Sequence, residues 1–434
     1  MIELITIVCS LITFLAFSTF PIKILNFKNR NSSFKITLYD TLFFNFIINI
    51  SVLFLLSFTN ISLSYYFIFI LASSILLNSY FILEDKNYKK IFKDNKFLIF
   101  IFFNFVIFFY LASNPTLSWD GQQNWFFKAQ SFYLNNNFFD LSSVRGPNYY
   151  PHFGSLIWGF FWKNSILQLE YSGRLAFIYL FLLSIFSVVN LLKVKDEIKI
   201  LFIAIIAILC FDDLLIRGYQ EILIFSLLIF ISKNIFYFFN NQKNFYLVIC
   251  FLCINLLPWI KNEGYIFLMV FNLSLLFFIK LIDHKYKILV FVFISTILLI
   301  IKNLIFYRYL GVNLTHGGEL SLLINLNDFI KYFRSMILGI FIVFFKYKIW
   351  FFILLSLYFI HFKYKKINNI FIKFLTINLI LYFIFIFVIY YSFSTHLYGI
   401  DWWIDNSLDR ILFQVSGFFI ILTLIVYDQI KFKS

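Results

Sequence analysis

The chain has few charged residues and, among those, few acidic ones. Only 13% of its 434 residues are Asp, Glu, Lys or Arg, whereas 62% are hydrophobic, and the mean hydropathy is +0.88. Soluble domains carry about 25% charged and 45–50% apolar residues. Proline and glycine are also scarce, at 5 and 13 residues. Because apolar runs of about 18 or more residues recur along the whole length, the sequence predicts a polytopic membrane protein without a soluble domain.

Cysteine is scarce as well. The four cysteines, Cys9, Cys210, Cys250 and Cys253, all lie in apolar stretches. The Cys250-x-x-Cys253 spacing suits a redox or metal pair, but no histidine or second pair lies near it in the sequence. Buried hydrophobic cysteines are the better interpretation. We therefore predict no cofactor and no specific metal, since a divalent metal has no supporting motif.

The first apolar run is predicted to be a retained span rather than a signal peptide. No basic residue precedes it, Glu3 is acidic, and no small-x-small cleavage site ends it. Lys23, Lys28 and Arg30 follow it, as they follow a membrane helix. Apolar spans are predicted at 2–20, 39–58, 62–83, 97–113, 171–192, 199–211, 221–239, 245–260, 264–282, 287–306, 347–362, 370–392 and 410–427.

Basic residues predict the orientation of these thirteen spans. Alternate connections hold 23 of the 36 basic and 8 of the 21 acidic residues, which places the formal net charge of +15 on one face. The positive-inside rule makes that face cytoplasmic, with the N-terminus external and the C-terminus cytoplasmic. The stretch 329–345 contains Lys331 and Arg334 and is predicted to be an amphipathic surface helix. The excess positive charge suits anionic lipid headgroups, and no basic patch for nucleic acid is present.

Polar and aromatic residues gather in the connections predicted to be external. In the longest, Asn114-Pro115 breaks the helix and Trp119-Asp120 follows near the membrane edge. Residues at helical spacing then predict a surface helix: Trp125, Lys128, Ala129, Phe132 and Tyr133. Further polar groups lie at 149–152, 217–221, 261–264 and 401–410. Ionisable groups at the bilayer boundary are costly and are functional candidates by default, so these positions predict a common site.

Five short motifs, "WDGQQNWFFKAQSFY", "YYP", "GYQE", "KNEG" and "SLDR", occur in this order. Together they resemble a family of bacterial membrane glycosyltransferases with the GT-C fold, related to the dolichyl-phosphate-mannose protein mannosyltransferases and to the aminoarabinose transferase that acts on lipid A. The resemblance covers about residues 97–428. It implies a transmembrane extension at 1–96 and a catalytic core at 97–434, with external loops 114–170, 307–346 and 393–409.

The resemblance implies a reaction and a catalytic base. A sugar would pass with inversion from a polyprenyl-phosphate carrier to an acceptor hydroxyl outside the cytoplasmic membrane. The acceptor is a glycan, a lipid or a protein. The family's catalytic aspartate matches Asp120, whose alternative is a helix cap. Members of the family often have an acidic residue next, where this chain has Gly121. That difference argues against an acidic metal pair.

The other candidates would bind substrate, and each has a simpler alternative. Arg410 is the first candidate to bind the phosphate, and its alternative role is to pair with Asp409. Lys261 is the second candidate, and its alternative role is to pair with Glu263 within the turn. Lys128 and Arg217 are weaker phosphate candidates, because external basic residues also meet headgroups. Glu221 and Glu263 either accept hydrogen bonds from hydroxyls or stabilise helix N-termini. Candidates that pack on the sugar or isoprenoid, or else form an interfacial belt, are Trp119, Tyr149, Tyr219, Trp402 and Trp403.

His152 is expected to provide shape and hydrogen bonding rather than catalysis. Two other functions compete with sugar transfer. A transporter or flippase of an envelope glycolipid would need ionisable groups and broken helices near the bilayer centre, often in inverted repeats. The other competing function is that of a non-catalytic subunit of an envelope glycan assembly complex.

Overall fold

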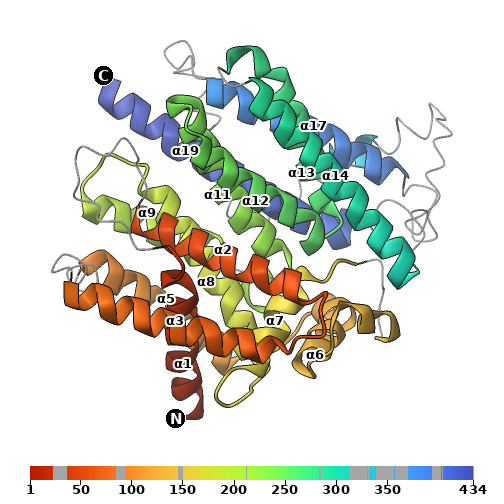
Figure 1. Cartoon of the computed structure of the whole chain (residues 1–434). Helices are drawn as coiled ribbons and strands as arrows, with labels where there is room; N and C mark the ends of the chain where they lie inside the picture. Colours follow the sequence, from red (N-terminus) through yellow and green to blue (C-terminus); the bar gives the residue numbers. More distant parts are fainter. Residues whose placement is uncertain are drawn as a thin grey trace. The chain divides into compact units, whose positions relative to one another are not determined.

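A computed structural model describes residues 1–22, 37–84, 94–144, 150–211, 213–282, 285–311, 330, 333–335, 337–338, 356, 370–392, 402 and 404–433. Within these ranges the chain forms helices and no strand, which confirms the predicted all-α class (Figure 1). The helices form two compact units, Met1–Ser226 and Leu227–Ser434. The boundary predicted at 96 and 97 lies inside the first unit.

Among the described residues, eight helices are long and apolar enough to cross a bilayer, so the protein is membrane-embedded. These spans are Ile2–Thr19, Leu38–Leu56, Leu63–Glu84, Asn95–Ser113, Tyr171–Val189, Glu221–Asn241, Lys285–Leu310 and Ile404–Asp428. Shorter apolar helices run over Asn244–Ile260, Glu263–Phe277 and Ile370–Ile386. The predicted span 199–211 corresponds to α9 (Asp196–Leu209), which has only 14 residues. The predicted span 347–362 and surface helix 329–345 fall largely outside the described residues.

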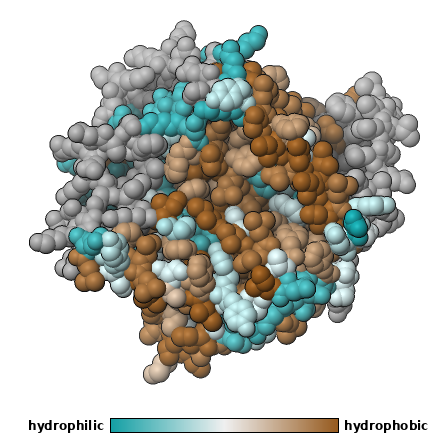
Figure 2. Space-filling model, in the orientation of Figure 1, coloured by the Kyte–Doolittle hydropathy of each residue, from teal (hydrophilic) through white to brown (hydrophobic). Residues whose placement is uncertain are grey.

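The first unit is built around α8 (Tyr171–Val189), every residue of which is buried. Around it pack α1 (Ile2–Thr19), α2 (Leu38–Leu56), α5 (Asn95–Ser113), α7 (Phe153–Lys163) and α9. By contrast, only 11% of the apolar window of α3 (Leu63–Glu84) is buried. A helix that is apolar all round and exposed along its length must face lipid. Figure 2 shows broad hydrophobic areas on the face in view.

Asparagines hold the end of α1 against α2. The Asn45 Nδ2 donates to the carbonyls of Ser18 and Ile22 at 2.9 and 2.8 Å, and Asn49 Nδ2 donates to those of Phe17 and Phe20 at 2.7 Å each. The last carbonyls of a helix have no intrahelical partner, and in lipid they have no water either. These two asparagines therefore have a structural role.

Between α5 and α7 lies the longest of the connections predicted to be external. It contains the π-helix η1 (Gly121–Phe126), α6 (Phe127–Tyr133) and the 3-10 helix η2 (Phe138–Ser143). The helix predicted from residues 125–133 is thus present, and it packs one face against α7. After α9, the short α10 (Asp213–Ile216) leads into α11 (Glu221–Asn241), whose first residues complete this unit.

The second unit contains the rest of α11 and the helices that follow it. In the part of the chain that the structure describes, these are α12 (Asn244–Ile260), α13 (Glu263–Phe277), η3 (Ile279–Leu281), α14 (Lys285–Leu310), α17 (Ile370–Ser392), the π-helix η6 (Ile404–Leu408) and α19 (Asp409–Lys433). Helix α13 packs on α12, α14 and α17, and α14 is largely exposed. Among the described residues of this unit, two lysines are buried within candidate spans, Lys233 in α11 and Lys302 in α14. Both lysines lie within helices that are apolar enough to cross a bilayer.

Candidate functional site

Asp120 stands directly before the π-helix η1 and does not cap it. Its backbone is already helical, with φ −62° and ψ −38°, and its side chain makes no capping hydrogen bond. The capping role belongs to Ser118, whose Oγ accepts a bond from the Gly121 N–H at 2.9 Å. The partly exposed carboxylate of Asp120 instead accepts from Asn124 Nδ2 at 3.3 Å. Asp120 therefore does not act as the helix cap that was its alternative role. It adjoins a π-helical turn, and such turns frequently occur at functional sites.

The turn before Asp120 contacts a second predicted motif across 99 residues of sequence. The carbonyl of Arg217 accepts bonds from the backbone N–H of Ser118 at 3.1 Å and from its Oγ at 3.2 Å. A Cβ on Gly121 would lie 2.6 Å from the same carbonyl oxygen. Glycine at position 121 is therefore required by this close approach. A larger side chain, acidic or not, does not fit here without a shift of the backbone.

The segment after Arg217 turns through Gly218, whose φ of +81° favours glycine. A Cβ there would also meet the Trp158 ring at 2.9 Å. The Arg217 guanidinium pairs with Asp213, its Nε lying 3.0 Å from Oδ1, and both side chains are about half-exposed. Tyr219 is half-buried.

Glu221 is completely buried as the first residue of α11, where a carboxylate also stabilises the helix N-terminus. Its neighbour Gln220 is completely buried too, and its carboxamide occupies the space beside the Cα of Gly154 in α7. Neither polar atom of Gln220 has a hydrogen-bond partner among the described residues. Buried amides usually have hydrogen-bond partners, and a bound polar group would supply them for Gln220. Gln220 was not among the sequence-predicted site residues, although it stands inside the "GYQE" motif.

Two predicted substrate contacts are buried between α6, α7 and their neighbours. Lys128 is 2% exposed, and its Nζ donates to the Tyr150 carbonyl. Burial lowers the pKa of Lys128 to about 7. His152 is 1% exposed, and its ring lies among aromatic rings of the first unit, namely Phe54, Phe58, Phe132 and Phe138. This packing agrees with a shape role for His152. Tyr149 lies outside the described residues.

In the second unit, the "KNEG" turn joins α12 to α13. The Nζ of Lys261 lies 3.0 Å from Oε1 of Glu263, and the two side chains are 8% and 21% exposed. This contact is the intraturn pair that was the alternative to a phosphate role for Lys261. Burial of such a pair is favourable only with good geometry and further hydrogen bonds.

Lys302 of α14 lies beside this turn and was not predicted. Its Nζ donates to Tyr265 Oη at 2.5 Å and lies 3.8 Å from the centre of the Tyr265 ring. The Trp259 and Phe306 rings are also close, at 5.7 and 4.8 Å. Tyr265 Oη donates in turn to Oδ1 of Asn303. Aromatic faces attract a desolvated cation, so this arrangement accommodates a lysine within a membrane span.

The "SLDR" motif crosses from the π-helix η6 into α19. Asp409 and Arg410 are both partly exposed, and Oδ1 of Asp409 accepts from the Arg410 backbone N–H at 2.7 Å. Trp402 is 43% exposed, as an interfacial or ligand-packing ring would be, and Trp403 lies outside the described residues. Asp120 and Asp409 therefore each adjoin a π-helix within their own unit.

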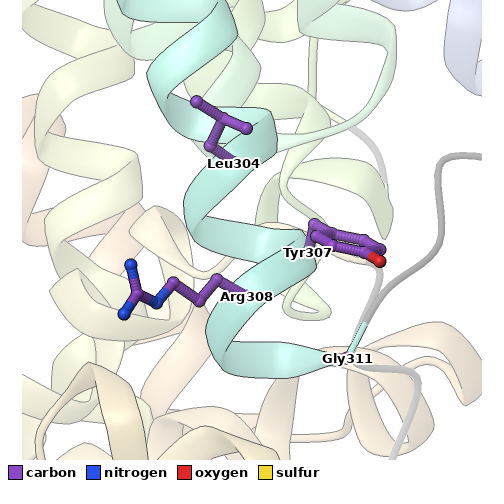
Figure 3. Close-up of a pocket in the computed structure, with 4 residues that line it drawn as sticks. All are labelled: Leu304, Tyr307, Arg308 and Gly311. Carbon is purple, nitrogen blue, oxygen red and sulfur yellow. The ribbon is translucent and has the colours of Figure 1, made fainter.

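A pocket of about 640 Å³ adjoins the end of α14. Leu304, Tyr307, Arg308 and Gly311 are the described residues that line it. In Figure 3 the Arg308 and Tyr307 side chains extend from different sides of the helix. The described lining therefore combines a guanidinium, an aromatic ring and an aliphatic side chain from one helix, and the ring and the guanidinium do not lie side by side.

No three His, Cys, Asp or Glu side chains in the described ranges are grouped so that they could hold a metal ion. Comparison with known proteins gives no match to a family model, to a curated protein or to a solved structure. The interpretation of the site therefore depends on the residues themselves.

Proposed function

We propose that the chain is a membrane glycosyltransferase that moves a sugar from a polyprenyl-phosphate carrier to an acceptor hydroxyl at the external face of the cytoplasmic membrane. The proposal includes thirteen spans, a GT-C core and the orientation predicted from basic charge. The observation that supports it most directly is the placement of Asp120. Its carboxylate is partly exposed, is not used as a helix cap, and adjoins both a π-helix and the Arg217 segment.

The reaction needs a base, a charge for the phosphate and fixed geometry. Asp120 takes the proton from the acceptor hydroxyl, whose oxygen bonds to the anomeric carbon as the bond from that carbon to the phosphate oxygen breaks. The leaving group is polyprenyl phosphate, and Arg410 is the first candidate to stabilise its charge. One carboxylate suffices for this single displacement, unlike the pair needed in glycoside hydrolysis. Lys261 ranks lower, because it already pairs with Glu263.

The test is transfer by Asp120→Asn in proteoliposomes supplied with a panel of synthetic polyprenyl-phosphate sugars and membrane extract as acceptor. We expect kcat to fall roughly 10²- to 10⁴-fold, the range for loss of a general base. The matched control is Asp140→Asn, because Asp140 is exposed in the same connection and its carboxylate caps η2, accepting from Asn137 N–H at 2.8 Å. Full transfer by a folded Asp120→Asn protein would exclude Asp120 as the base.

A transporter or flippase is the second candidate, and the buried lysines favour it. Lys233 and Lys302 lie within spans, where ionisable groups often mark a transport route. Flux of a labelled glycolipid across liposomes that contain the purified protein, without chemical change to the lipid, would support this function over transfer.

A further inference from the structure

Arg174 lies in the first turn of α8, and every N–H donor of its guanidinium group makes a hydrogen bond. It forms a forked pair with Glu170, from Nε to Oε1 at 2.9 Å and from Nη2 to Oε2 at 2.8 Å. Its remaining bonds go to backbone carbonyls: Nη1 donates to Thr116 at 3.0 Å and to Ile216 at 2.6 Å, and Nη2 donates to Pro115 at 2.8 Å. The side chain is 1% exposed.

The three carbonyls belong to the two chain segments that form the candidate site in the first unit. Thr116 is four residues before Asp120, and Ile216 is the residue before Arg217. These segments also meet directly through Ser118 and the Arg217 carbonyl. One guanidinium therefore sets the spacing of the segment that carries Asp120 and the segment that carries Arg217.

The Arg174 guanidinium is held in place by its surroundings in the first unit. The Trp158 ring lies 5.7 Å from the Arg174 guanidinium and also fills the space beside Gly218. Burial raises the pKa of Glu170, and the adjacent guanidinium opposes the rise. Helix α8 is buried along its whole length, so the guanidinium is fixed to the core of the unit. A lysine has a single charged point and cannot reproduce these forked bonds.

We propose that Arg174, oriented by Glu170, is the positioning residue of the candidate site and holds Asp120 in register with the Arg217–Glu221 segment. This role rests on the proposed function, because a positioning residue needs a catalytic group to position. Its structural part is testable without a substrate. Its catalytic part follows from the sensitivity of transfer rates to misplacement, since a shift of about 1 Å costs on the order of 10²-fold.

The first measurement is hydrogen exchange by mass spectrometry on the full chain in nanodiscs, with Arg174→Lys and Glu170→Gln. We expect peptides spanning 113–122 and 213–220 to exchange at least about tenfold faster together, while peptides from α12 and α13 stay unchanged. The matched control is Ser184→Ala, which removes a buried hydroxyl on the same helix that donates to the Phe181 carbonyl. Acceleration of only one segment, of neither, or of the whole first unit equally would overturn the proposal.

The second measurement is transfer by the same variants. We expect kcat to fall about 10²-fold in Arg174→Lys with little change in KM for the lipid-linked sugar, because donor contacts remain while the base moves. Unchanged kcat in a variant whose two segments exchange faster would refute the positioning role. If the unsubstituted protein transfers no sugar, the proposed function fails, and the exchange experiment still tests whether Arg174 joins the two segments. If Arg174→Lys does not fold, Glu170→Gln serves both measurements, because it keeps the shape of the partner.

Discussion

Replacing Gly121 with alanine tests how closely the two motifs of the first unit must approach. The new Cβ would lie 2.6 Å from the Arg217 carbonyl oxygen, whereas ordinary contact begins at 3.4 Å, so the segments must separate by about 3.4 − 2.6 = 0.8 Å. The obstacle is backbone rather than the flexible end of a side chain, so it cannot rotate away.

The separation breaks two hydrogen bonds. The Arg217 carbonyl accepts from Ser118 N–H at 3.1 Å and from Ser118 Oγ at 3.2 Å, and an added 0.8 Å carries both beyond hydrogen-bond range. Each net bond contributes about 0.5–1.5 kcal/mol, so the local opening free energy falls by about 1–3 kcal/mol. Amide exchange over 118–121 should then accelerate roughly 5- to 150-fold. If Asp120 is the base, the same shift lowers kcat by on the order of 10²-fold.

Hydrogen exchange and the transfer assay measure both effects. Gln122→Ala is the matched control, because Gln122 is the exposed next residue in the same π-helix. Gly121→Glu places a larger side chain at the same position and should be at least as disruptive as Gly121→Ala. Normal exchange and normal transfer in Gly121→Ala would refute the argument that this contact determines residue 121.

Two further predictions concern buried lysines. The pKa of Lys128 is lowered by burial from 10.5 to about 7, so between these values the unfolded chain binds more protons and stability rises with pH. The rise is at most on the order of 5 kcal/mol. In Lys128→Met this rise in the free energy of unfolding between pH 7 and pH 9.5 should disappear when unfolding is measured in detergent. An unchanged pH dependence in the variant would show that Lys128 is not its source. Lys302→Met should keep its unfolding free energy within about 1–2 kcal/mol, because loss of the cation–π contacts is offset by relief of desolvation. A loss of about 3–5 kcal/mol in Lys302→Met would show instead that the charge is net stabilising. Lys302→Ala measures the cost of the cavity that a smaller side chain leaves.

Much of the helical architecture is predictable from local sequence. The apolar run at 171–192 corresponds to α8 at Tyr171–Val189, and the helical spacing of 125–133 corresponds to η1 and α6. The interpretation of Cys250 and Cys253 as buried hydrophobic residues is also confirmed, since both are free and fully buried. These features depend on residue type and spacing within one segment.

The candidate site was predicted only in part. Its motifs were identified, but the helix-capping role belongs to Ser118 and not to Asp120. Arg174 and Lys302 were missed because a basic residue inside an apolar run gives no sign of what it contacts. The substrate-binding roles of Lys261, Glu263, Asp409 and Arg410 stay predictions.

The sequence by itself determined that this protein is helical and embedded in a membrane. The free energy of transferring an apolar run into lipid is a sum over neighbouring residues and needs no knowledge of distant ones. The tertiary structure decided which groups near Asp120 cap, position or remain exposed. Those roles depend on hydrogen bonds between residues far apart in the chain, such as Ser118 and Arg217 at a separation of 99 positions and Arg174 and Pro115 at 59. Such contacts leave no periodic pattern in the sequence, because their geometry exists only after the helices have packed.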